Sequence, residues 1–107
     1  FIDPKSRFGE YLHAKESRQK AMYHRFVNDK TLKATAKYLE IAKQYDMHPV
    51  TLAVSWSMHF DFVASTIIGA RYANQLEVSF KALEIKLNAE ILREIETVQK
   101  EILYPMG

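Results

Sequence analysis

The sequence predicts a mainly helical piece of a parallel α/β fold. Residues 63–68 form a short apolar run whose β-branched members, Val63, Thr66, Ile67 and Ile68, are typical of a strand buried on both faces. Segments with helical periodicity lie on both sides of this run, and such alternation is the pattern of a parallel sheet covered by helices. Because no second strand is found for the first to pair with, the neighbouring strands are expected outside this sequence.

Composition agrees with a globular domain or part of one. The 107 residues are 48% apolar and 26% charged, and the net charge of +2 is too small to indicate nucleic acid or a membrane surface. No cysteine is present, which excludes disulfides and thiolate metal sites and fits a reducing, cytoplasmic compartment. No apolar stretch approaches the ~20 residues of a membrane helix. The start at Phe1, without an initiator Met, suggests a chain taken from something longer.

Residues 1–30 lack a clean period and are predicted to form a long loop with one short helix. Pro4, Ser6 and Gly9 interrupt them, and aromatic residues are mixed with basic ones. This mixture could indicate nucleic-acid binding, but the basic residues form no continuous stripe, so a surface loop is favoured.

The next segment, residues 31–45, is predicted to be an amphipathic helix, with lysines on its outer face. Its expected inward residues are Leu32, Thr35, Ala36, Leu39 and Ala42. His48 and Pro49 then indicate the start of a second helix. In residues 50–58 apolar side chains occur on every side, so this helix is expected to be buried nearly all round, with Trp56 in the core.

Two further helices are predicted after the strand. Residues 73–83 place Leu76, Phe80 and Leu83 at helical spacing, and residues 89–103 follow the N-cap residue Asn88. The inward stripe expected on the last helix is Ile91, Ile95, Val98 and Ile102.

The junction between the strand and the following helix has the layout of an anion site. Gly69 and Ala70 turn the chain, and the helix begins just past Arg71. The first N–H groups of a helix carry the positive end of its dipole, and a guanidinium beside them adds a cationic fork. Gln75 and Ser79 lie one and two turns further along. The alternative is a tight turn with a solvated arginine, and short motifs of this kind do not separate the two.

Several separate blocks resemble the C-terminal third of an aldo-keto reductase, most closely the bacterial branch related to potassium-channel β-subunits. They are residues 38–45 (YLEIAKQY), 48–56 (HPVTLAVSW), 65–71 (STIIGAR), 75–76 (QL) and 87–90 (LNAE). The resemblance covers residues 31–107 in order, including Tyr104 and Pro105.

This resemblance implies an α/β parent with the (β/α)8 TIM barrel, of which the chain is a mainly helical C-terminal fragment with about four helices and one strand-like segment. Residues 1–30 would be the loop and short helix after barrel strand seven. Residues 31–107 would supply the helix seven region, strand eight, helix eight and the C-terminal helix. An isolated fragment would leave its strand edge uncovered, and a homo-oligomer is one way to cover it.

The resemblance also implies a cofactor, NADP, bound partly by this chain. By position, Gly69 and Ala70 would approach the cofactor, Arg71 would pair with the adenosine 2′-phosphate, and Gln75 would lie against the adenine. Ser79 departs from the family pattern, which often has Asn there, so its contact is the least secure of the five.

No catalytic residue is assigned to this chain. The family's reduction of a carbonyl uses a tyrosine, lysine, aspartate and histidine on earlier strands, and no tyrosine or histidine here has the matching context. The parent is therefore expected to be an NADP-dependent oxidoreductase with a small-molecule carbonyl substrate, and the fragment alone to be inactive. No metal site is expected, since the four histidines never pair at i, i+4 beside a carboxylate.

Two other classes stay open on the sequence. Residues 31–59 form helix, turn, helix, as in a DNA-binding module, although the second helix offers no Arg, Lys, Asn or Gln to read bases. An all-α interaction module is the other, and it would leave the strand unexplained.

Overall fold

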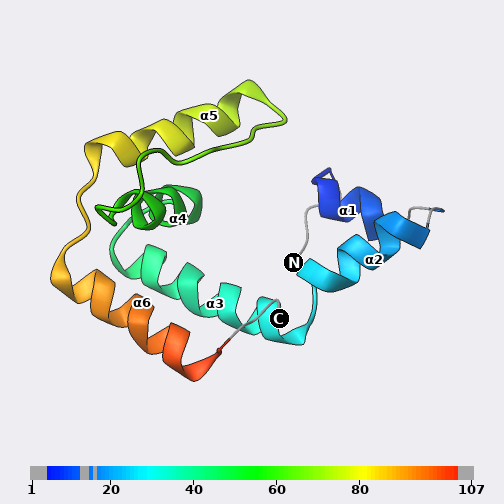
Figure 1. Cartoon of the computed structure of the whole chain (residues 1–107), viewed down its shortest axis with the longest axis horizontal. Coiled ribbons are helices and arrows are strands. Elements are labelled where there is room, and N and C mark those ends of the chain that lie inside the picture. Colours follow the sequence, from blue (N-terminus) through cyan, green and yellow to red (C-terminus); the bar gives the residue numbers. More distant parts are fainter. Residues whose placement is uncertain (1–4, 13–14, 16, 104–107) are drawn as a thin grey trace. The chain divides into compact units, whose positions relative to one another are not determined.

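The computed structural model describes residues 5–12, 15 and 17–103, and this part of the chain is helical (Figure 1). It falls into two compact units, residues 1–36 with 102–107 and residues 37–101, which are treated separately below. The helices are α1 (Arg7–Leu12), α2 (Ser17–Phe26), α3 (Asp29–Gln44), α4 (Pro49–Met58), α5 (Ala73–Phe80), the 3₁₀ helix η1 (Lys81–Glu84) and α6 (Ala89–Glu101).

The first unit contains two helices where a loop with one short helix was predicted. Aromatic side chains that look scattered in the sequence pack together: the ring of Phe8 lies 5.7 Å from that of Phe26 and 6.1 Å from that of Tyr11. The Ser6 hydroxyl accepts from the Gly9 N–H at 3.1 Å and so caps the start of α1. The prediction failed because both helices depend on contacts between them, which no local period reveals.

α3 begins two residues earlier than predicted, because Asn28 and Thr31 cap it reciprocally. The Thr31 N–H donates to Asn28 Oδ1 at 3.1 Å, and the Asn28 N–H donates to Thr31 Oγ1 at 2.9 Å. This is the capping-box arrangement with Thr in the place of the usual Glu or Gln.

The face that α3 buries also differs from the prediction. Leu32 and Leu39 are 43% and 46% exposed, and Thr35 and Ala36 are exposed as well. Of the predicted inward residues Ala42 is buried, and the other buried residues of the helix are Ala34 and Ile41, which were not predicted. The helix carries two apolar stripes at helical spacing, and its partners in the fold decide which of them is covered.

The core of the second unit joins α3, α4 and α6. It consists of Ile41, Ala42, Leu52, Leu87, Ile91, Ile95 and Val98, with Trp56 packed against it. The predicted stripe on α6 is therefore confirmed, except that Ile102 lies past the end of the helix. The Asn88 cap is also confirmed, since Ile91 N–H donates to its Oδ1 at 2.9 Å.

The turn between α3 and α4 contains a C-terminal cap on α3 and an N-terminal cap on α4. Asp46 has a left-handed backbone with φ of 51°, and Met47 N–H donates to Ala42 O at 2.8 Å, as in a Schellman motif. His48 Nδ1 then accepts from the Val50 N–H at 3.1 Å, which confirms the prediction that His48 starts a helix. These bonds set the direction in which α4 leaves α3.

α4 is less buried than its composition predicts. Within it Thr51, Leu52 and Ser55 are buried, whereas Val50 and Met58 are 43% and 40% exposed. On α5 and η1 the buried residues are Ser79 and Ala82, and the predicted inward residues Phe80 and Leu83 are 54% and 72% exposed. Within the described residues, the other elements leave one side of these helices exposed.

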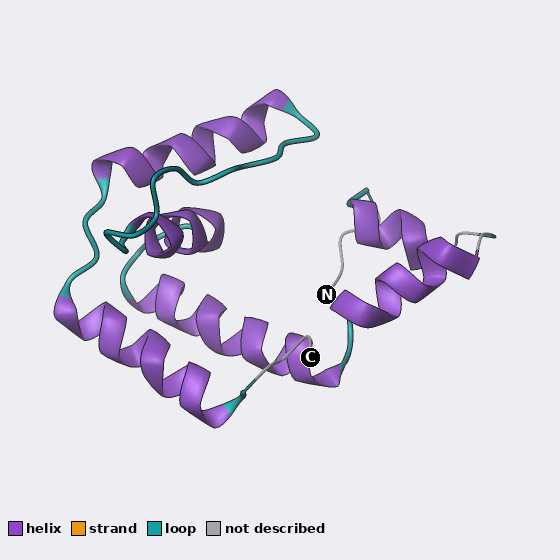
Figure 2. Cartoon of the chain, in the orientation of Figure 1, coloured by secondary structure: helices purple, strands orange, loops and turns teal. Residues whose placement is uncertain are grey.

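Residues 63–68, predicted as a strand buried on both faces, form no strand. Figure 2 shows the connection from α4 to α5 as a loop, and Ile67 in it is 96% exposed. A strand needs a partner for its backbone donors and acceptors, and the described residues provide none. The segment is thus unpaired, as expected for a strand separated from its sheet.

Tyr45, the residue directly after α3, forms a hydrogen bond with the carboxylate of Glu94 on α6. The hydrogen bond to Glu94 raises the pKa of the Tyr45 hydroxyl to about 12, with smaller contributions from burial and from the nearby Glu90. Lys37 Nζ lies 3.0 Å from Glu101 Oε2, which links α3 to α6.

Among the described residues no helix is long and apolar enough to cross a membrane.

The Tyr45 pKa generates a prediction for stability against pH. Folding raises this pKa from about 10 to about 12, so the neutral phenol stabilises the fold below pH 10 and this contribution is lost as the pH rises toward 12. Tyr45→Phe should therefore be less stable than the wild type at neutral pH and should approach it in strong alkali. Denaturant unfolding of both proteins over this range measures the difference, and a difference that does not change with pH would contradict the assignment.

Candidate functional site

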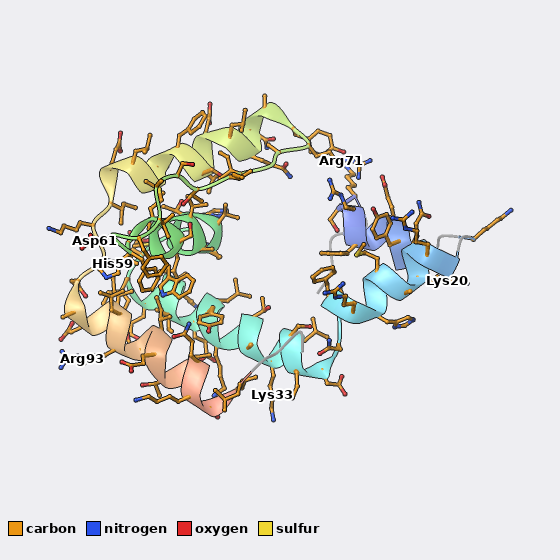
Figure 3. The ribbon with its side chains drawn as sticks, in the orientation of Figure 1. Lys20, Lys33, His59, Asp61, Arg71 and Arg93 are labelled. Atoms are coloured by element: carbon orange, nitrogen blue, oxygen red, sulfur yellow. The ribbon has the colours of Figure 1, made fainter. Side chains whose placement is uncertain are left out.

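The predicted anion site lies where the connection from α4 reaches α5. This connection begins at His59 and Asp61, and Figure 3 shows Arg71 at its opposite end, directly before the first turn of α5. Gly69, Ala70 and Arg71 are all exposed. The structure therefore brings the turn, the arginine and the helix start together as the sequence predicted.

Gly69 leaves open space beside the backbone. A Cβ placed on it would meet no atom within 4 Å, and its φ is not positive. The chain itself therefore needs neither the small size nor the special conformational freedom of glycine here. The open side leaves room for another group to approach the backbone.

The side chain of Gln75 is folded back over the start of its own helix. Its Oε1 accepts from the Arg71 N–H at 2.7 Å and from the Tyr72 N–H at 3.2 Å. Gln75 occupies the third position of α5, where Glu or Gln commonly caps a helix in this way. The bend at residues 71–72 is thereby tied to the first turn of α5.

Ser79 differs from the other four predicted site residues. It is 8% exposed, and its hydroxyl donates to Gln75 O at 3.4 Å. The side chain is thus directed into the packed side of α5. Its predicted contact with a cofactor does not fit this burial and remains a prediction from the resemblance.

Two polar contacts with α4 position the site, and the sequence reading missed both. Thr51, which is 1% exposed, donates from Oγ1 to Val78 O at 2.7 Å and so joins α4 to α5. Ser57 donates to Val54 O at 2.8 Å and lies 3.2 Å from Thr66 Oγ1, in the loop before the site. The available signal was the set of three hydroxyl residues, Thr51, Ser55 and Ser57, on an otherwise apolar helix, since hydroxyl groups usually need a nearby acceptor when buried.

A hollow on the surface between α3 and α6 differs in character from the predicted anion site. It is lined by Lys37, Glu40, Ile41, Gln44, Glu94, Thr97, Val98 and Glu101. Its carboxylates outnumber its one cation, which itself pairs with Glu101. This lining is unsuited to a phosphate group. Within the described part of the chain no group of three His, Cys, Asp or Glu side chains could hold a metal ion.

Comparison with known proteins gives consistent matches. The family model of the aldo/keto reductases matches residues 1–100. Protein tas of Escherichia coli (strain K12) is 34% identical over 83 residues, which are 78% of this chain and 24% of that protein. A putative voltage-gated potassium channel subunit beta of Schizosaccharomyces pombe is 36% identical over 61 residues, or 55% of this chain and 18% of that protein. The chain thus spans about a quarter of the length of the first of these relatives.

The Thr51 bond generates a prediction about stability. Thr51→Val keeps the shape of the side chain but leaves the Val78 carbonyl without its donor, so the free energy of unfolding should fall by about 1–3 kcal/mol. Thr51→Ser retains the hydroxyl and is the matched control. Chemical denaturation measures both variants. A loss of stability in Thr51→Ser with none in Thr51→Val would show that packing of the methyl group, rather than the hydrogen bond, matters at this position.

Proposed function

Because this chain belongs to the aldo/keto reductase family, we propose that it supplies the part of an NADPH-dependent carbonyl reductase that holds the adenosine 2′-phosphate of the cofactor. The observation that carries the proposal is the position of Arg71, exposed and directly before the N-terminus of α5. A guanidinium and the first N–H groups of a helix both attract a dianionic phosphate, and here the two are adjacent in the chain.

The neighbouring residues support this assignment in different degrees. The open side of Gly69 gives a ligand access to the backbone, and Ala70 beside it is small and exposed. Gln75 lies in the first turn of α5. Buried Ser79 fits least well and is not given a direct contact in this proposal.

The parent protein would be a (β/α)8 barrel oxidoreductase of the cytoplasm acting on a small carbonyl compound. The cofactor would supply the hydride, and the residues that handle the proton would lie outside this chain. This chain's share is binding and discrimination between NADPH and NADH, because the two cofactors differ only in the 2′-phosphate. Without the remainder of the barrel it should carry out no reduction.

The proposal is tested with the smallest ligand that contains the recognised group. Adenosine 2′-phosphate and adenosine are titrated into the chain and followed by the NMR signals of residues 69–76. The phosphate should bind more tightly than the nucleoside, and Arg71→Met should remove roughly tenfold or more of that preference, since a charged hydrogen bond is worth about 1.5–3 kcal/mol.

Arg93→Met is the control, because Arg93 is an exposed arginine on α6 rather than at the start of α5 (Figure 3). It should leave the preference unchanged. Equal affinity of the unmodified chain for the two ligands, or an unchanged preference in Arg71→Met, would overturn the proposed function.

A further inference from the structure

We infer that Gln75 acts as a positioning residue that holds Arg71 in place for the phosphate, and does not itself recognise the adenine. This inference rests on the proposed function and assigns a different role to one of its residues. Its basis is the pair of hydrogen bonds from the backbone of residues 71 and 72 to a single side-chain oxygen.

Those two bonds occupy the acceptor of the Gln75 amide. A carbonyl oxygen has two lone pairs, and Oε1 accepts once from Arg71 at 2.7 Å and once from Tyr72 at 3.2 Å. Oε1 is then no longer able to accept from the amino group of adenine. A role for Oε1 in reading that base would require the cap to break, and only the Nε2 amide could donate to adenine with the cap in place.

The same bonds hold the backbone on which the guanidinium is mounted. The loop before Arg71 has no regular secondary structure, whereas α5 is anchored to α4 through Thr51 and Val78. Gln75 also donates its own backbone N–H to Tyr72 O at 3.1 Å, so it is bonded to the bend in both directions. Arg71 is thus held in place by Gln75, which belongs to a helix, α5, that is itself anchored to α4.

The two bonds to Gln75 Oε1 also determine which backbone N–H groups remain available to bind an anion. The N–H groups of Arg71 and Tyr72 point to Gln75. By helix geometry the next N–H groups, those of Ala73 and Asn74, have no acceptor within α5 and point out of its N-terminus. A phosphate would therefore meet the first turn of α5 together with the Arg71 side chain.

The test uses Gln75→Met, which has nearly the same length and no acceptor amide. If Gln75 positions Arg71, this variant should lower the affinity for adenosine 2′-phosphate roughly threefold to tenfold, the usual effect of one or two hydrogen bonds. The affinity for adenosine should not change. If Gln75 contacts the adenine, both ligands should weaken by the same factor, which would overturn the inference.

Coupling to Arg71 provides a second readout that a general loss of structure would not give. The double variant Arg71→Met with Gln75→Met should bind adenosine 2′-phosphate no more weakly than Arg71→Met alone, because Gln75 acts through Arg71. Additive losses in the double variant would overturn the inference.

Two variants control for the fold of α5. Gln75→Glu keeps the capping oxygens, so slow hydrogen exchange of the Arg71 and Tyr72 amides should persist in it and be lost in Gln75→Met. Glu77→Gln changes an exposed residue of the same helix and should leave ligand binding unchanged.

The outcome distinguishes the two claims. Loss of phosphate preference in Arg71→Met with no effect of Gln75→Met would leave the proposed function in place and refute the role of Gln75. No phosphate preference in the unmodified chain would refute both.

Discussion

Thr51 connects the packed part of the second unit to the candidate site. Its hydroxyl, almost fully buried, donates to the carbonyl of Val78 and thereby holds α5 against α4. A partly buried backbone carbonyl that loses a donor is costly, so this bond favours the observed placement of α5. Gln75 lies in the first turn of α5, and its side chain accepts a hydrogen bond from the backbone of Arg71. The position of a surface arginine therefore depends on a contact in the interior.

The second unit is organised around packing between α3, α4 and α6. Leu52 of α4 belongs to the same core as Ile41 of α3 and Ile95 of α6. At the edge of this core Tyr45 and Glu94 add a polar link, in which a neutral phenol is bound to a carboxylate. Apolar contacts supply most of the stabilisation, and the polar links restrict how the helices are aligned.

The exposed apolar residues are consistent with a chain that spans only part of its relatives. Phe62, Ile67 and Leu83 are 85%, 96% and 72% exposed, and Ile67 lies in the segment that has the sequence of a buried strand. The family fold is a barrel in which each strand pairs with two neighbours. Apolar side chains suited to such an interior stay largely exposed where the described residues provide no neighbouring strand.

Features that depend on near neighbours along the chain could be predicted from the amino-acid sequence. Helix starts at His48 and Asn88, the stripe on α6 and the junction at Arg71 could be predicted, because caps and periods are local. The blocks of family sequence likewise indicated the aldo/keto reductases. The five site residues are contiguous or one helical turn apart, so their grouping needed no tertiary information, although their binding role is still a prediction.

Only the tertiary structure decided which of two possible faces each helix buries and where the polar anchors lie. α3 could have buried Leu32 and Leu39 together with Ala42, but its packing partners cover Ala34 and Ile41 beside Ala42 instead. Likewise the acceptor of Thr51 is 27 residues away, and Ser79 is directed inward by the same contact between α4 and α5. The strand at residues 63–68 did not form, because pairing is a property of two segments and the described part of this chain contains one.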